Sequence, residues 1–114
     1  MRCLIIINDP PYGTERLFNG LRLAHALAEK ANDVVVFLMS DAVVAAKKGQ
    51  QTPEGYYNTQ FMLDKVVRHG TVLLCSSCLK ARALDKSELL EGTQSSSMAA
   101  LAEETIKAER VITF

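Results

Sequence analysis

Four short, nearly continuous apolar runs limit the folds that this chain can adopt. The runs cover residues 3–7, 34–39, 71–75 and 111–114. Apolar runs of this length, without polar alternation, are typical of strands buried on both faces. Stretches with apolar residues at helical spacing separate the runs, and such alternation favours a parallel sheet with right-handed crossovers. The sequence therefore predicts an α/β fold, a three-layer sandwich in which helices flank a mainly parallel sheet.

Helices are expected in the connections between the runs, over about 14–31, 42–48, 58–69, 76–84 and 98–106. Thr14 and Asp41 are the predicted N-caps of the first two, because short polar side chains accept hydrogen bonds from the free N–H groups of a helix start. The apolar stripe of the first helix extends to Ala31. The last helix follows a cap within serines 95–97. It has the regular stripe of an amphipathic helix, formed by Met98, Leu101, Ala102, Thr105 and Ile106.

Composition and charge exclude several classes of protein. The 114 residues are 48% hydrophobic, which predicts one packed domain over residues 1–114. Thirteen basic residues balance thirteen acidic ones and form no stripe, so a nucleic-acid partner is not expected. The apolar runs are too short to span a membrane, and the N-terminal residues do not resemble a signal peptide. We therefore expect a cytoplasmic protein, in which three cysteines do not form a disulfide framework.

Two cysteines lie where the third run ends and the next helix begins. Cys75 is the last residue of the predicted strand, and Cys78 falls in the first helical turn. Ser76 or Ser77 is placed to cap this helix. The free N–H groups and the positive dipole end of a helix start lower the pKa of a nearby thiol and favour the reactive thiolate. The alternative is inert packing, because free cysteine is among the most buried residue types.

Ligands of parallel α/β sheets bind outside the carboxyl ends of the strands. This rule gathers at one edge the residues that follow each of the first three strands. The pocket-lining residues expected beside the two cysteines are Asp9, Tyr12, Ser40, Asp41, Ser76 and Arg82. Cys3 begins a strand and His69 precedes one, so both are expected at the opposite edge.

Three kinds of site find little support in the sequence. A cysteine–histidine dyad needs a base within reach of the thiol, but His69 is expected at the wrong edge and His25 lies within a helix. A structural zinc site needs four ligands, of which the single C-x-x-C supplies two. No glycine-rich phosphate-binding motif is present. No metal or cofactor is therefore expected. Thiol chemistry remains, either as dithiol–disulfide exchange or as carriage of a sulfane sulfur in a persulfide.

Several segments together resemble the DsrE/DsrF-like sulfur-relay family over nearly the whole chain, namely 6–10, 36–43, 74–82 and 108–114. The resemblance implies a small α/β sandwich of flavodoxin-like arrangement, which forms trimers or hexamers and transfers sulfur in thiolation or sulfur oxidation. Sulfur-carrying members use a cysteine at the end of the third strand, which implies this role for Cys75, with Cys78 as the second candidate. Where the family often has glycine after the arginine of this segment, the chain has Ala83.

The expected function is that of a small cytoplasmic sulfur carrier of the sulfurtransferase type. Cys75 would accept sulfur from a donor protein as a persulfide and pass it to an acceptor protein. The alternatives are a dithiol–disulfide oxidoreductase that uses the C-x-x-C, and a non-catalytic oligomeric binding module. A homotrimer or a dimer of trimers is expected. Neutral net charge leaves little repulsion between copies, and Tyr56 and Tyr57 belong to a residue type enriched at interfaces.

Overall fold

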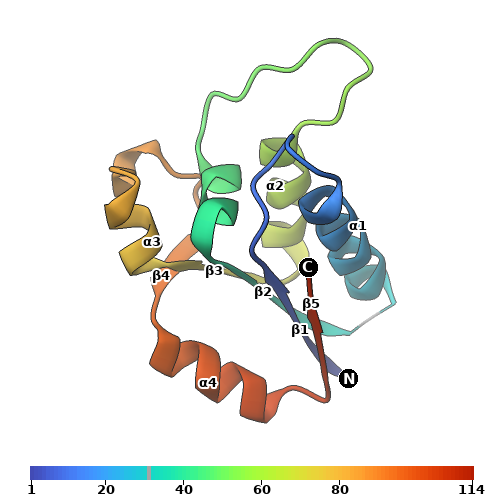
Figure 1. The fold of residues 1–114 in the computed structure, drawn as a ribbon. Helices are drawn as coiled ribbons and strands as arrows, with labels where there is room; N and C mark the ends of the chain where they lie inside the picture. Colours follow the sequence, from blue (N-terminus) through green and yellow to red (C-terminus); the bar gives the residue numbers. More distant parts are fainter. Residues whose placement is uncertain (31) are drawn as a thin grey trace.

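The computed structural model describes residues 1–30 and 32–114, and within them the strands form one five-stranded parallel sheet (Figure 1). The strand order is β4-β3-β2-β1-β5. The strands are β1 (Arg2–Ile7), β2 (Asp33–Leu38), β3 (Thr71–Cys75), β4 (Thr93–Ser96) and β5 (Arg110–Thr113). Every neighbouring pair is parallel, as the alternation of strands and helices predicts.

Helices cover both faces of this sheet. Helices α1 and α2 lie on one face and α4 crosses the other (Figure 1). The chain steps in one direction from β1 to β4 and then returns across the sheet to β5, so right-handed crossovers place α4 on the opposite face. The helices are α1 (Arg16–Glu29), η1 (Ser40–Ala46), α2 (Thr59–His69), α3 (Ser76–Ala81), η2 (Lys86–Glu88) and α4 (Met98–Lys107). The predicted three-layer sandwich is confirmed.

The central strands supply most of the core. Ile5, Val36 and Val72 lie side by side across β1, β2 and β3, and all three are fully buried. Burying an aliphatic side chain of this size contributes about 1.5–3 kcal/mol. Among the described residues, each helix is too short or too polar to cross a lipid bilayer.

Two predicted helix starts are wrong. Helix α1 begins at Arg16 with Glu15 at its N-cap. Thr14 lies before this cap, where its hydroxyl accepts from the Arg16 N–H at 3.3 Å. The helix after β2 is a 3₁₀ helix that begins at Ser40 with Met39 at its N-cap, so Asp41 lies in the first turn and is not the cap. The predicted end of the first helix at Ala31 falls outside the described residues.

The strand β4 was not predicted, because its sequence Thr-Gln-Ser-Ser lacks an apolar run. It forms at the edge of the sheet by pairing with β3, and Cys75 lies opposite Ser96. Ser97 is the N-cap of α4, and its hydroxyl accepts from the Ala100 N–H at 3.2 Å. The predicted serine cap is therefore confirmed at Ser97, while the two serines before it belong to the strand.

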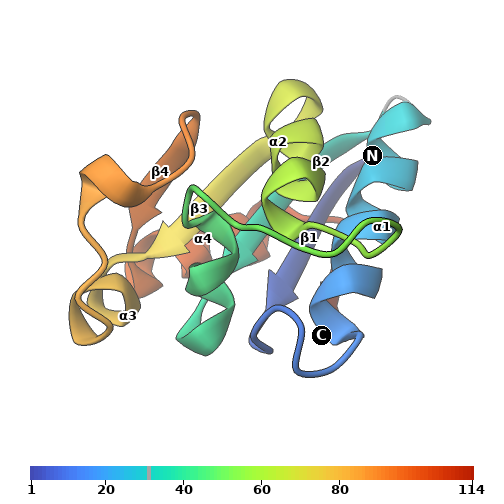
Figure 2. The same cartoon turned by 90° about the horizontal axis from the view of Figure 1, so that it is seen from above.

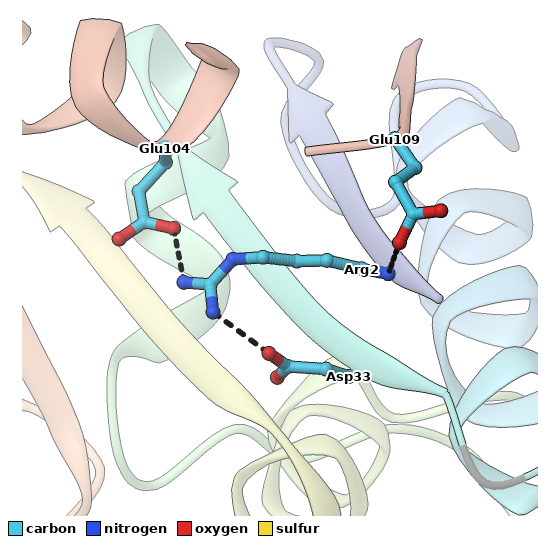
Figure 3. A network of polar contacts seen from close by, with 4 residues as sticks. All are labelled: Arg2, Asp33, Glu104 and Glu109. Carbon is cyan, nitrogen blue, oxygen red and sulfur yellow. Dashed lines mark hydrogen bonds and ion pairs between the residues drawn. The ribbon is translucent and has the colours of Figure 1, made fainter. Parts of the chain in front are cut away.

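The ion pairs of Arg2 hold α4 against the sheet (Figure 3). Its guanidinium bonds to Glu104 of α4 at 2.5 Å and to Asp33 of β2 at 2.7 Å. Its backbone N–H donates to Glu109 at 3.1 Å. Arg2 and Asp33 begin their strands, so this network lies at the amino end of the sheet. Because Arg2 and Asp33 are partly exposed, we expect a contribution of about 1 kcal/mol.

Helix α3 ends earlier than the predicted residue 84. Its last residue is Ala81, and the chain then leaves through a left-handed residue, Ala83, with φ of 54°. The Ala83 N–H donates to the Lys80 carbonyl at 3.1 Å and the Leu84 N–H donates to the Leu79 carbonyl at 3.0 Å. These two bonds define a Schellman motif, which usually places glycine at the left-handed position.

Candidate functional site

The carboxyl ends of β1, β2 and β3 point toward one edge of the molecule, where η1 and α3 lie (Figure 2). Cys75 ends β3 and Cys78 follows within α3. Ser40, the first residue of η1, follows β2. Cys3 instead lies buried near the start of β1 and pairs with Val34. The two cysteines of the C-x-x-C therefore share an edge of the sheet that Cys3 does not reach.

Helix η1 contacts Cys78 directly. The backbone N–H of Ser40 donates to the Cys78 Sγ at 3.2 Å. Ser40 also adopts a φ of 53°, a left-handed conformation that is uncommon for a residue other than glycine. Sequence reasoning placed Ser40 at this edge but gave no signal for its bond to sulfur.

An ion pair holds η1 and α3 together around this contact. Arg82 bonds to the Asp41 carboxylate through Nε at 2.9 Å and Nη2 at 2.8 Å. Its Nη1 also donates to the Cys78 carbonyl at 3.1 Å. Arg82 and Asp41 thus fix the position of the Cys78 backbone relative to Ser40.

The Cys75 thiol lies in an environment that favours its thiolate. The residue is 9% exposed, and its Sγ lies 3.3 Å from the Ser77 Oγ. Burial raises the pKa of Cys75, but hydrogen bonds from the side chains and backbone N–H groups of Cys78 and Ser77 outweigh it and lower the pKa from its ordinary value. These contacts favour the thiolate of Cys75 relative to that of an ordinary cysteine.

The Cys78 thiol is shifted in the opposite direction. Burial raises its pKa, and so does the hydrogen bond that it donates to Cys75, while the Ser40 N–H and the Arg82 charge lower it by less. The two thiols therefore have different polar neighbours: Cys78 accepts from the Ser40 N–H, and Cys75 lies beside the Ser77 hydroxyl.

The expected cap of α3 by Ser76 or Ser77 is wrong, because Cys75 itself occupies the N-cap position. Ser77 instead bonds to Cys75. Ser76 lines a hollow of about 380 Å³ together with the serines at the end of β4 and the start of α4, which are Ser95, Ser96 and Ser97. Sequence reasoning missed these serines as neighbours of Cys75 because it did not predict β4, although their run in the sequence was visible.

Comparison with known proteins identifies the family of this chain. The profile of the DsrE/DsrF-like family matches residues 1–114. The chain belongs to the DsrE/DsrF-like family. The resemblance seen in the sequence segments is therefore confirmed.

Relatives within the DsrE/DsrF-like family agree with this assignment. The protein YchN of Escherichia coli K12 is 41% identical over 116 residues, which cover 99% of this chain and 98% of YchN. The crystal structure of E. coli ychN superposes with a TM-score of 0.94 and covers 100% of this chain and 99% of that one. A Salmonella typhi protein named sulfurtransferase TusD is 27% identical over the full length of both chains. The relatives of this chain therefore include a protein named as a sulfurtransferase.

Asp9 and Tyr12 bond to other partners than the two thiols. The Tyr12 hydroxyl donates to Gln50 Oε1 at 2.5 Å and accepts from the Thr59 N–H at 3.0 Å. The Asp9 carboxylate accepts from the Thr14 hydroxyl at 2.8 Å. Tyr12 lines a second hollow of about 560 Å³, whose aromatic wall is formed by Phe18, Tyr56 and Tyr57. Sequence reasoning missed Gln50, because its bond to Tyr12 joins segments that lie 38 residues apart in the sequence.

The histidines lie at a distance from the cysteine pair. His69 ends α2 immediately before β3, and Cys75 ends that strand. The length of β3 therefore separates them by roughly 17 Å. His25 of α1 faces His69, with ring centroids 6.3 Å apart. Within the described part of the chain, no group of three or more histidine, cysteine or acidic side chains could hold a metal ion.

Proposed function

We propose that this chain is a sulfur carrier that uses Cys75. The Cys75 thiolate attacks the outer sulfur of a donor persulfide and becomes a persulfide itself, while the donor leaves as a thiolate. An acceptor thiolate then attacks the outer sulfur and releases the Cys75 thiolate. Atoms and electrons balance in both steps, and neither step needs a cofactor.

The observation that carries this proposal is the position of Cys75, which ends β3, is the N-cap of α3 and has its Sγ 3.3 Å from the Ser77 Oγ. Cys75 has a lowered pKa because Cys78 and Ser77 donate hydrogen bonds to its sulfur. A thiolate rather than a thiol is the nucleophile in sulfur transfer. Membership of a family that includes a protein named sulfurtransferase supports the same reaction. Sulfur donor and acceptor proteins are the proposed partners. The cytoplasm is the proposed location, because it keeps cysteine thiols reduced.

The test measures transferable sulfur after brief loading. The protein is incubated with glutathione persulfide, separated from the donor and treated at once with cyanide, which takes sulfane sulfur as thiocyanate. We expect thiocyanate from the wild type and from the control variant Cys3→Ala, because Cys3 lies away from the site. We expect none above background from Cys75→Ser. Equal yields from Cys75→Ser and the wild type would exclude Cys75 as the carrier.

An assembly of three or six copies is also proposed, through the outer face of α4 and the edge strand β5. Leu101 of α4 is buried, but Met98 and Ile106 are 63% and 84% exposed. Val111 and Ile112 of β5 are also exposed. Large apolar side chains left exposed on neighbouring elements are often covered by another protein. A second copy of the chain is the proposed occupant.

Light scattering coupled to size exclusion tests this assembly. We expect a trimer or hexamer mass at micromolar concentration for the wild type, and a smaller mass for Ile106→Glu, which would bury a charge in the interface. Lys107→Glu is the matched control, because Lys107 is exposed on the neighbouring polar side of α4. A monomer mass for the wild type would refute the assembly.

A further inference from the structure

We propose that Cys78 is a resolving thiol, which discharges the persulfide on Cys75 as sulfide and leaves a Cys75–Cys78 disulfide. This inference rests on the carrier function proposed above and adds a second fate for the sulfur. The sulfur passes to an acceptor thiol when one is docked, and it leaves as hydrosulfide when none is present.

The positions of the two cysteines allow them to join. Cys75 is the N-cap of α3 and Cys78 lies three residues later in its first turn. Helical geometry places Cα atoms at this spacing about 5 Å apart. Disulfides span Cα separations of about 4.4–6.8 Å. The bond can therefore form without unfolding the end of β3.

The surroundings of Cys78 indicate more than packing. Ser40 keeps a left-handed backbone and donates its N–H to the Cys78 Sγ at 3.2 Å. Such a bond stabilises negative charge on that sulfur as its proton leaves. The Arg82–Asp41 pair, at 2.8 Å, holds the two segments that make this contact. A second thiol that only filled space in the core would not need this hydrogen bond.

The reaction balances without a further participant. The Cys78 thiol gives its proton to the deprotonated outer sulfur of the persulfide and attacks the inner sulfur, which is the Cys75 Sγ. The bond between the inner and outer sulfurs breaks, and the outer sulfur leaves with the electron pair as hydrosulfide. The two cysteine sulfurs are oxidised to a disulfide, and the sulfane sulfur is reduced by two electrons. A reduced dithiol, such as dithiothreitol in the test tube, restores both thiols by exchange.

The side chains around the pair leave a route for the product. Cys78 is half-buried rather than enclosed, and Ser77 beside it is exposed. Ser76 opens on the serine-lined hollow of about 380 Å³. Hydrosulfide formed at Cys75 can therefore leave without movement of the sheet.

The test compares the lifetime of the persulfide in the wild type and in Cys78→Ser. Both are loaded with glutathione persulfide and freed of donor, and released sulfide and intact mass are then followed with time. We expect the wild type to release one sulfide for each persulfide lost and to end as the disulfide. Cys78→Ser should keep its persulfide about tenfold longer or more, because an intramolecular attack is lost.

Further variants separate the possible failures. Cys78→Ala repeats the comparison without a hydroxyl, and the melting temperatures of both variants report whether they fold. Cys3→Ala is the matched control and should behave as the wild type. An equal persulfide lifetime in wild type and Cys78→Ser, or sulfide release without the disulfide, would overturn the resolving role while leaving the carrier function intact. Failure of the folded Cys78→Ser protein to gain any sulfur would overturn both.

Discussion

Replacing Ala83 with glycine should stabilise the protein. Ala83 follows α3 with φ of 54°, in the position of a Schellman motif where the backbone must be left-handed. The Cβ atom makes this conformation cost about 1–2 kcal/mol for an L-residue, and glycine removes that cost. The greater freedom of glycine in the unfolded chain returns about 0.4–1 kcal/mol. The net expected gain is about 0.5–1 kcal/mol.

Thermal and urea denaturation measure this gain. For a domain of this size a change of this magnitude raises Tm by about 2–4 °C. Both proteins must be compared at one concentration, because assembly would make Tm depend on it. The matched control is Ala81→Gly, since Ala81 is exposed like Ala83 but belongs to the helix. This control should lose up to about 1 kcal/mol.

The test depends on the signs of the two changes in Tm, a rise for Ala83→Gly and a fall for Ala81→Gly. If Ala83→Gly lowered Tm as Ala81→Gly does, residue 83 would not have a left-handed backbone in solution, and the assigned end of α3 would be incorrect. A rise in Tm for both variants would point instead to a general effect of glycine in this segment.

Two further predictions concern thiol reactivity and close packing. Iodoacetamide should label Cys75 faster than Cys3 at neutral pH, and equal labelling on peptide mapping would count against the site. The labelling rate of Cys75 should rise with pH around a midpoint below that of an ordinary thiol, because the pKa of Cys75 is lowered. Gly92→Ala should destabilise the protein by about 1–3 kcal/mol more than Gly49→Ala. Both glycines have φ near 90°, so the strain of a left-handed alanine is shared. A Cβ at Gly92 would lie 2.4 Å from Val67 Cγ1, whereas one at Gly49 meets no described atom within 4 Å. Equal losses in the free energy of unfolding, measured by urea denaturation, would refute this reason.

The strands that could be predicted from the sequence are those whose own residues form an apolar, buried run. The run 71–75 became β3 without a shift of a single residue, because Gly70 bounds it on one side and a helix start on the other. The same reasoning could not find β4, whose four residues are polar or half-exposed and take strand conformation through pairing with β3. Edge strands of this kind are specified by their neighbour, which a local pattern does not contain.

Helix α4 shows a second limit of sequence reasoning. Its apolar stripe correctly predicted a helix, but Met98 and Ile106 lie on the outer surface. The spacing of apolar residues in a sequence shows how wide the apolar face of a helix is, but it does not show which part of the protein covers that face. In this chain Leu101 and Glu104 attach α4 to the sheet. The ion pair of Glu104 with Arg2 cannot be predicted from a local sequence pattern.

The location of the candidate site, at the end of a strand, could be predicted from the sequence. The position of Cys75 and Cys78 at a strand-to-helix junction followed from the sequence. Their opposite pKa shifts did not, because they depend on the orientation of Ser77 and on the Ser40 N–H. Ser40 reaches Cys78 across 38 residues of sequence and through a left-handed backbone, for which the sequence carries no signal.

Intact mass spectrometry of two variants, each lacking one cysteine of the C-x-x-C, tests the central claim most directly. Cys78→Ser and Cys75→Ser are incubated in parallel with glutathione persulfide and weighed before any reductant is added. If Cys75 carries the sulfur, Cys78→Ser gains the mass of one sulfur atom and Cys75→Ser gains none. A gain of sulfur by Cys75→Ser, or by neither folded variant, would contradict sulfur carriage on Cys75.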